Sequence, residues 1–228
     1  MRYYPVFLDL KEVPCLVIGA GQVGERKVKT LQSCLARVSL ISQDLTPYLQ
    51  EEVRTGRISW LAKSYETKFL SDMFLVIGAT DDAELNETIG QEARDRGLLC
   101  NIADDPQNCN FILPALLTRG DLTIAVSTSG KSPALAKKIR QDLEKGFPEI
   151  YGPYLEILGH IRTEVLARKR PQKENQKIFE ALVYSPLLDY LEAGTLEPVY
   201  DLLDRLFDPP LPRSKWSSII DQLFSSSQ

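Results

Sequence analysis

Short apolar runs alternate with amphipathic stretches between residues 13 and 103. Continuous apolar runs are typical of strands that are buried on both faces, and strands that alternate with helices are typical of a parallel sheet. We therefore expect the first part of the chain to be an α/β unit whose sheet is covered by helices on both sides. The runs predict strands at 13–18, 37–42, 57–61, 74–80 and 98–103, and the stretches between them predict helices at 25–35, 47–55 and 83–96.

The pattern changes after residue 110. Two apolar segments, 111–117 and 122–128, flank a turn of a few residues, which predicts an antiparallel hairpin or corner. Ser132 and Pro133 then predict the start of a helix that ends near residue 145, because serine is a favoured N-cap and proline is tolerated at the first helical position. From about residue 150 onward only helical periodicity is left. The expected organisation is a parallel-sheet domain at 1–113, a small α+β segment at 114–149 and a helical domain at 150–228.

Composition places the chain among soluble globular proteins. Of its 228 residues, 43% are hydrophobic and 25% are charged, which is ordinary for that class. No apolar run approaches the roughly 20 residues that a membrane-spanning helix needs. The N-terminal segment reaches Pro5 and Asp9 before any apolar run is long enough for a signal peptide, so we expect a cytoplasmic protein. The net charge of −4 argues against a nucleic-acid partner, which would require a basic surface.

Cysteine and histidine usage limits the possible chemistry. The four cysteines are widely spaced without a CxxC motif, so we expect them to be reduced. Cys15 and Cys100 lie in apolar runs and are interpreted as core residues, whereas Cys109 lies in a polar loop and is the one candidate for a reactive thiol. A single histidine, His160, excludes an HExxH zinc site or a site with three histidine ligands. His160 lies beside Ile161 in an amphipathic stretch, and we interpret it as a satisfied structural histidine rather than a ligand.

Residues 19–24 read Gly-Ala-Gly-Gln-Val-Gly and connect the first predicted strand to the first predicted helix. In that context the spacing is typical of a dinucleotide-binding loop. Gly19 would allow a tight turn, Gly21 would let the backbone approach a pyrophosphate, and Gly24 would allow close packing of helix on strand. The N–H groups at the start of the helix would then bind the phosphates. The competing interpretation is a glycine turn in a sheet protein that binds nothing.

The end of the second predicted strand bears on the choice between NAD and NADP. It ends near Ser42, where many NAD-binding proteins carry an acidic residue for the ribose. Asp44 stands two residues further, about 20 residues after the glycine loop, and could take that role. No arginine follows the strand directly to receive a 2′-phosphate, so the sequence favours NAD.

Two further segments carry candidate chemistry. Asp104 and Asp105 follow the fifth predicted strand, and the carboxyl ends of parallel strands border the ligand crevice of such a sheet. A carboxylate there could be a general base or an ordinary solvated loop acid, and position alone does not separate these interpretations. Residues 128–133 combine hydroxyls, Lys131 and a predicted helix N-terminus into a surface suited to anions. The competing interpretation of this segment is a loop that only caps its helix.

Four segments together are more specific than the glycine loop: GAGQVGERK at 19–27, GATDD at 78–82, CNIADDP at 100–106 and FILPALLTRGDLTIAVSTSGKSPALAKKIR at 111–140. They resemble the precorrin-2 dehydrogenase and sirohydrochlorin ferrochelatase family, whose members occur alone or as the N-terminal half of bacterial siroheme synthases. The resemblance covers roughly residues 3–145, in the same order and with nearly constant spacing. Beyond residue 150 it is only to a small helical domain that varies across the family.

The resemblance implies NAD-dependent oxidation of precorrin-2 to sirohydrochlorin in siroheme biosynthesis. Some members also insert ferrous iron to give siroheme. The implied fold is an NAD-binding Rossmann domain, here 1–113, then a dimerisation segment, here 114–149, and then helices. The implied assembly is an intertwined homodimer with each active site near the subunit junction.

The resemblance also assigns residues, and no resident metal is among the assignments. Asp104 matches an aspartate implicated in catalysis, where it could take the proton that is lost as the hydride leaves. Thr128 stands where members often carry serine in the tetrapyrrole pocket, and Asn101 and Lys131 are further candidate substrate contacts. The expected cofactor contacts are Gly19, Gly21, Gln22, Val23, Gly24, Ser42, Gln43, Asp44, Thr80 and Asp81.

Other classes of function stay open. The sequence contains no methyltransferase half, so we expect the protein to receive precorrin-2 made elsewhere. A non-catalytic NAD-sensing module would also show the glycine loop, but it would need neither Asp104 nor residues 128–133. A chelatase without redox activity would keep Asp104 and would not need the glycine loop, which counts against that alternative.

Overall fold

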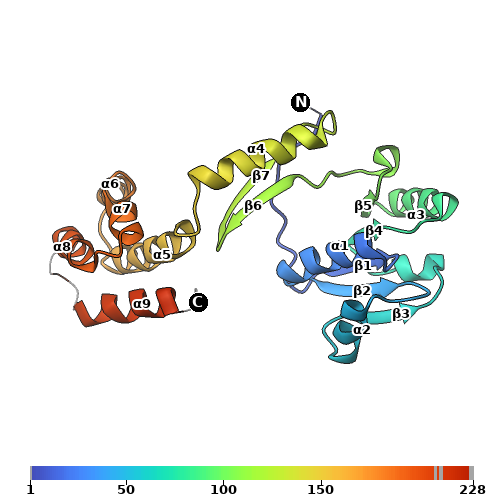
Figure 1. Cartoon of the computed structure of the whole chain (residues 1–228), viewed down its shortest axis with the longest axis horizontal. Helices are drawn as coiled ribbons and strands as arrows, with labels where there is room; N and C mark the ends of the chain where they lie inside the picture. Colours follow the sequence, from blue (N-terminus) through green and yellow to red (C-terminus); the bar gives the residue numbers. More distant parts are fainter. Residues whose placement is uncertain (1, 208–209, 211–212, 226–228) are drawn as a thin grey trace. The chain divides into compact units, whose positions relative to one another are not determined.

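Residues 2–207, 210 and 213–225 are described by the computed structural model, except for the side chains of residues 215 and 222–225. The chain forms two units, each with its own core (Figure 1). Unit 1 comprises Met1–Leu113 with Ser129–Lys131, and unit 2 comprises Pro114–Thr128 with Ser132–Gln228. None of the described helices combines the length and the apolar character of a membrane span.

The sheet of unit 1 consists of five parallel strands: β1 (Pro14–Ile18), β2 (Arg37–Ile41), β3 (Ser59–Ala62), β4 (Leu75–Gly78) and β5 (Leu99–Ile102). They lie in the order β3-β2-β1-β4-β5, which is the order of a Rossmann sheet. β1 pairs with both β2 and β4, so the strand order reverses at β1. In open sheets of this kind, ligands bind at that reversal, beyond the carboxyl ends of the strands. The predicted parallel α/β fold is confirmed.

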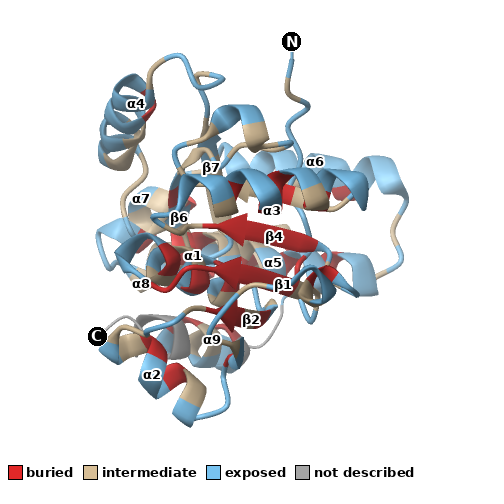
Figure 2. Ribbon diagram, turned by 90° about the vertical axis from the view of Figure 1, so that its right-hand side faces the viewer, coloured by how far each residue is buried: buried red, intermediate tan, exposed pale blue. Residues whose placement is uncertain are grey.

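Helices cover the sheet of unit 1 on both faces, so its central strands are buried (Figure 2). Along β1, Cys15 and Val17 contribute to one apolar cluster and Leu16 and Ile18 to the other, and none is more than 2% exposed. Burial on both faces is the reason why the strand sequences are continuously apolar. The covering elements are α1 (Gln22–Ser33) and α2 (Pro47–Arg54) on one face, and the 3-10 helix η1 (Thr67–Leu70) and α3 (Ala83–Asp95) on the other.

Unit 2 begins with an antiparallel hairpin of β6 (Ala115–Arg119) and β7 (Leu122–Val126), followed by α4 (Pro133–Gly146). The hydroxyl of Ser132 accepts a hydrogen bond from the N–H of Leu135 at 3.2 Å, and Pro133 occupies the first turn. The predicted hairpin and the predicted helix start are therefore both confirmed.

Two predicted boundaries are wrong by more than two residues. The first helix begins at Gln22 rather than at Glu25, because the N–H of Glu25 already donates to the carbonyl of Gly21 at 2.9 Å. β6 begins at Ala115 rather than at residue 111, because the preceding backbone is bonded elsewhere. The N–H of Asn110 donates to the carbonyl of Cys100, and the carbonyl of Phe111 accepts from the side chain of Asn101.

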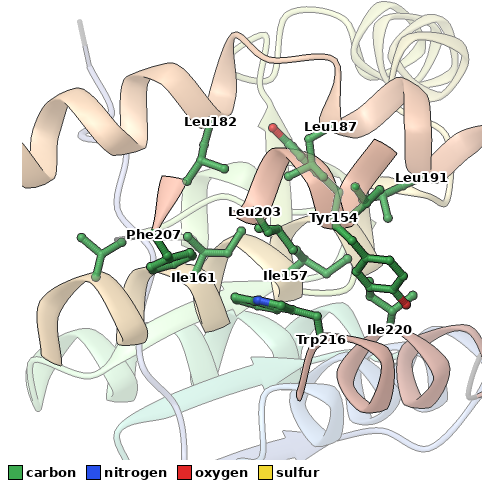
Figure 3. Packing of buried hydrophobic residues seen from close by; sticks show 13 residues of the cluster. Tyr154, Ile157, Ile161, Leu182, Leu187, Leu191, Leu203, Phe207, Trp216 and Ile220 are labelled. Carbon is green, nitrogen blue, oxygen red and sulfur yellow. The ribbon is translucent and has the colours of Figure 1, made fainter. Parts of the chain in front are cut away.

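Helices form the rest of the described part of unit 2, as predicted: α5 (Tyr151–Ala167), α6 (Gln172–Val183), α7 (Leu187–Glu192), α8 (Leu196–Leu206) and α9 (Arg213–Ser225). They pack around one apolar cluster, whose members include Ile157, Ile161, Leu203 and Trp216 (Figure 3). Each of these four side chains is at most 1% exposed. The helical part thus has a core of its own, independent of the sheet of unit 1.

A buried carboxylate fastens α1 to α2 on one face of the sheet. Glu52 on α2 has a side chain only 6% exposed, and it accepts hydrogen bonds from Arg57 at 2.6 and 2.8 Å. The side-chain amide of Gln32 on α1 donates to the same carboxylate at 2.6 Å. The hydrogen bond from Arg57 is the main reason why the pKa of Glu52 falls from its ordinary value to about 2.

We expect Glu52→Gln to lower the free energy of unfolding by about 1–3 kcal/mol at neutral pH, because Arg57 loses its ionised partner. The native pKa lies below the unfolded one, so this contribution is complete above the unfolded pKa and is lost as the pH falls through about 2. The gap in stability between wild type and variant should therefore narrow as urea unfolding is repeated at decreasing pH. Glu51→Gln, which removes an exposed pair with Arg54, is the matched control and should change little. A gap independent of pH would contradict the assignment.

Candidate active site

The glycine loop joins β1 to α1 through backbone contacts that only glycine allows. Gly19 has a φ of +100°, and a Cβ on it would lie 2.2 Å from the carbonyl oxygen of Ala79, just after β4. A Cβ on Gly24 would lie 1.9 Å from the carbonyl oxygen of Gly19. A side chain at either glycine would therefore force apart the turn, the helix and the neighbouring strand.

Gly21 is a glycine for a different reason. It is the N-cap residue of α1 with a φ of −72°, and a Cβ on it would meet nothing within 4 Å. No side chain caps the helix, so its first N–H groups are available to a ligand. Neither the fold nor the backbone conformation requires glycine here, whereas a pyrophosphate close to the backbone does. The loop therefore fits a dinucleotide, with the exposed Gln22 and Val23 beside it.

Ser42, at the end of β2, supports the glycine loop from the side. Its hydroxyl accepts a hydrogen bond from the N–H of Ala20 at 3.2 Å. Its N–H donates to the carbonyl of Ala62 at 3.2 Å, and its carbonyl accepts from the indole of Trp60 at 3.1 Å. Ser42 thus fixes the loop, while Gln43 and Asp44, which follow it, are exposed.

Thr80, after β4, is held by a buried asparagine of α3. The hydroxyl of Thr80 lies 2.8 Å from Oδ1 of Asn86, and Nδ2 of Asn86 donates to the carbonyl of Thr80 at 2.9 Å. Asp82 caps α3 by accepting from the N–H of Leu85 at 3.0 Å. Of the two residues predicted here as cofactor contacts, Thr80 shapes the loop and Asp81 is exposed.

The loop after β5 places two neighbouring acids, Asp104 and Asp105, in different surroundings. Asp105 accepts hydrogen bonds from Asn108 and Gln107 and caps the 3-10 helix η2 (Pro106–Asn108). These bonds, above all the one from the Asn108 side chain, lower the pKa of Asp105. Asp104 is exposed and has a φ of +59°, an uncommon conformation for a residue other than glycine. Asp105 is therefore a structural cap, and Asp104 is the acid that faces outward.

Lys27, on α1, is not among the residues that the sequence pattern predicts for the site. Its half-buried ammonium group interacts electrostatically with Asp104 and with Cys109. Burial is the largest influence and lowers the pKa of Lys27, while the two neighbours act in the opposite direction. Helical spacing could have predicted this location, because Lys27 lies three residues after Gly24 and therefore on the buried face of α1. The buried residues of that face are Gly24, Val28 and Leu31.

The three residues predicted to contact the substrate differ in their surroundings. The amide of Asn101 donates to the carbonyl of Phe111 at 3.2 Å, within unit 1. The hydroxyl of Thr128 accepts from the N–H of Ser132 at 3.1 Å, within unit 2. Lys131 is exposed. Asn101 and Thr128 thus have structural partners, and contact of any of the three with substrate stays a prediction.

The candidate reactive thiol and the single histidine need reinterpretation. Burial raises the pKa of Cys109, which keeps its thiol protonated and disfavours reactivity. His160 is exposed on α5 and is therefore not part of the helical core. Among the described residues, no group of three His, Cys, Asp or Glu side chains could hold a metal ion.

We expect Gly21→Asp to abolish NAD binding while leaving the fold intact, because the added carboxylate enters the space proposed for the pyrophosphate and the new Cβ has no protein atom within 4 Å. Calorimetric titration with NAD and thermal unfolding would measure the two effects. Gly159→Asp is the matched control, since it adds the same charge at another glycine whose Cβ meets nothing. Undiminished NAD affinity in Gly21→Asp would exclude this placement of the cofactor.

Two family models and a solved structure resemble this chain. The family model described as "Putative NAD(P)-binding" matches residues 6–115, and the one described as "Sirohaem biosynthesis protein central" matches residues 119–146. A solved structure described as SirC, precorrin-2 dehydrogenase, has the same fold, with a TM-score of 0.76 and 23% identity over 90% of this chain and 98% of that one.

Curated relatives extend the comparison along the chain. Siroheme synthase 1 of Pectobacterium atrosepticum is 38% identical over 86% of this chain and 41% of its own length. The siroheme synthase of Sodalis glossinidius is 37% identical over 90% of this chain and 44% of its own length. The chain thus spans less than half the length of these relatives. The chain is thus similar to siroheme-biosynthesis proteins, with a match to an NAD(P)-binding domain followed by a match to the central segment of those proteins.

Proposed function

We propose that this protein oxidises precorrin-2 to sirohydrochlorin with NAD, as a step of siroheme biosynthesis. One observation carries the proposal: the exposed carboxylate of Asp104 and the dinucleotide-shaped glycine loop both lie at the carboxyl edge of the same sheet. That arrangement brings a proton acceptor to the edge where a hydride acceptor would bind. The names of the siroheme synthases and of the precorrin-2 dehydrogenase structure support the choice of substrate.

The reaction removes a hydride and a proton from the macrocycle and leaves a new double bond. When bound, NAD supplies the hydride acceptor. The start of α1, at Gly21, holds the pyrophosphate, and Asp44 is the acid that binds the ribose hydroxyls. Asp104 takes the proton on its carboxylate, and the ammonium group of Lys27 interacts electrostatically with it. A positioned general base of this kind contributes about 10²–10⁴ in rate.

Insertion of ferrous iron is a narrower proposal. The pyrrole nitrogens must lose protons as the metal enters, and Asp104 is again the exposed acid that can receive them. A module that only senses NAD does not need a carboxylate on a residue with a left-handed backbone conformation. Asp104 therefore favours an enzyme over a sensor.

A homodimer formed through residues 114–149 is the proposed assembly. Leu116 on β6 is 41% exposed, and Leu135 and Ile139 on α4 are 48% and 37% exposed. Leu135 and Ile139 are four residues apart, so they share one face of the helix. Exposed apolar surface of this kind is typical of an interaction site.

A cytoplasmic location is also proposed, because the four cysteines are free and suit a reducing compartment.

We expect Asp104→Ala to lower turnover at least about 100-fold while leaving NAD affinity nearly unchanged, because only the proton acceptor is removed. The assay mixes protein, freshly generated precorrin-2 and NAD without oxygen and follows NADH and sirohydrochlorin together. Asp72→Ala is the matched control, since Asp72 is also an exposed aspartate at positive φ. Equal turnover in wild type and Asp104→Ala would remove the general-base assignment.

The same assay separates the alternative functions. Product from wild type confirms the dehydrogenase, and added ferrous iron then tests chelation. NAD binding without any product would favour the sensor, and siroheme formed only from supplied sirohydrochlorin and iron would indicate a chelatase.

We expect sedimentation to show a dimer for wild type and a monomer for the double variant Leu135→Lys, Ile139→Lys, because two charges would be buried without partners in the interface. Gln141→Lys changes an exposed polar residue of the same helix and should leave the dimer intact. A monomeric wild type, or a dimeric double variant, would contradict this interface.

A further inference from the structure

The thiol of Cys109 lies inside the loop that carries Asp104. Its sulfur accepts a hydrogen bond from the N–H of Ile102 at 3.1 Å. It also lies 3.3 Å from the carbonyl oxygen of Ile102 and 3.1 Å from that of Asp105, either of which can accept the S–H proton. The side-chain amide of Asn101 approaches the sulfur at 3.5 Å. One sulfur atom thus connects Ile102, at the end of β5, to Asp105, which follows Asp104.

The chain around Asp104 is a tight turn that would favour glycine. The N–H of Asp105 donates to the carbonyl of Ile102 at 3.4 Å, which closes a four-residue turn with Asp104 in its third position. A positive φ at that position is easiest for glycine, because a Cβ crowds the backbone. The turn keeps an aspartate there, so other contacts must offset the strain.

The far end of this loop is fixed to α3. Nη2 of Arg94 donates to the side chain of Asn108. Gly90 packs against the same residue so closely that a Cβ on the glycine would lie 2.9 Å from the Cβ of Asn108. Cys109 follows Asn108 directly, so its sulfur bonds back to the turn from a fixed point. Among the described residues, the other side-chain hydrogen bonds to this turn are those of the cap at Asp105.

The contacts of Cys109 require a protonated thiol. Two carbonyl oxygens within 3.3 Å would repel a thiolate, and burial raises the pKa of the group. The sulfur therefore acts as a donor and acceptor within the loop and not as a nucleophile.

We propose that Cys109 is a positioning residue for Asp104: its thiol bridges Ile102 and Asp105 and so holds the turn in the conformation that presents the Asp104 carboxylate. This inference rests on the proposed role of Asp104 as the proton acceptor in precorrin-2 oxidation. Nothing in it requires that the thiol touch substrate or cofactor.

The test is a double-mutant cycle between Cys109 and Asp104. We expect Cys109→Ala to lower kcat about tenfold with little change in the KM for NAD, because a displaced base slows the chemical step and spares the glycine loop. In the Asp104→Asn background the same cysteine change should alter single-turnover rates less than about twofold, since there is no base left to position. Cys109→Ser should fall between wild type and Cys109→Ala, because a hydroxyl keeps the donor and acceptor but reaches less far.

Two further measurements separate positioning from general stability. Hydrogen exchange of the Ile102 amide, which needs no activity, should quicken in Cys109→Ala because that N–H loses its acceptor. Cys100→Ala is the matched control: its thiol is buried in β5 and, among the described residues, its sulfur makes no hydrogen bond, so kcat and Ile102 exchange should stay unchanged.

Different outcomes would contradict the positioning role of Cys109 and the proposed function. If wild type oxidises precorrin-2 and Cys109→Ala is equally fast, the positioning role is wrong while the proposed function stands. An equal loss of rate from Cys109→Ala in both backgrounds overturns the positioning role as well, since the cysteine then acts independently of Asp104. If wild type binds NAD but forms no sirohydrochlorin, the proposed function fails and the inference fails with it.

Discussion

The close approach of three backbone segments at Gly19 is the constraint on which the site of unit 1 depends. The turn after β1, the end of β4 and the first turn of α1 meet there without room for a Cβ on Gly19 or Gly24. This contact fixes the start of α1 at the point where the strand order reverses. It also determines where Lys27 lies, because Lys27 follows Gly24 by three residues on the buried face of the helix.

Three loops at the carboxyl edge of the sheet each contact a side chain that is not exposed to solvent. Ser42 bonds to the glycine loop, Asn86 holds the residues after β4, and Cys109 holds those after β5. Residues next to these anchors are left exposed. This division explains why several side chains that the sequence suggested as ligand contacts have structural partners instead, while their neighbours remain available. Exposed residues of these loops include Gly21, Asp44, Asp81 and Asp104.

The sequence was sufficient for the fold because the fold depends on local patterns. Continuous apolar runs, amphipathic stretches and the Ser132-Pro133 cap each report on a few neighbouring residues, and together they determine the strand and helix order. The glycine spacing was equally informative, since Gly19 and Gly24 are required by contacts within a single supersecondary unit.

The details that the sequence did not reveal depend on bonds between distant segments. β6 starts late because Asn101 and Cys100, on β5, bind the backbone of residues 110 and 111. Asp104 and Asp105 look alike in sequence, and only the bonds of Asp105 to Gln107 and Asn108 separate cap from candidate base. Residue propensities and hydrophobic periodicity describe neighbouring residues and do not include such contacts.

Backbone strain becomes informative only together with its position. Five other described residues besides glycine have a positive φ. Leu35, Asp72 and Lys169 each follow the C-cap of a helix, where this conformation is common. Glu12 lies in the turn before β1, and Ser129 lies in the loop between β7 and α4. Asp104 follows a strand, at the edge where ligands bind, and its carboxylate is exposed while the turn around it is fixed. A glycine would relieve the strain and remove the carboxylate. The exposed acid at the ligand-binding edge of the sheet therefore supports the proposal that the reaction takes place at Asp104.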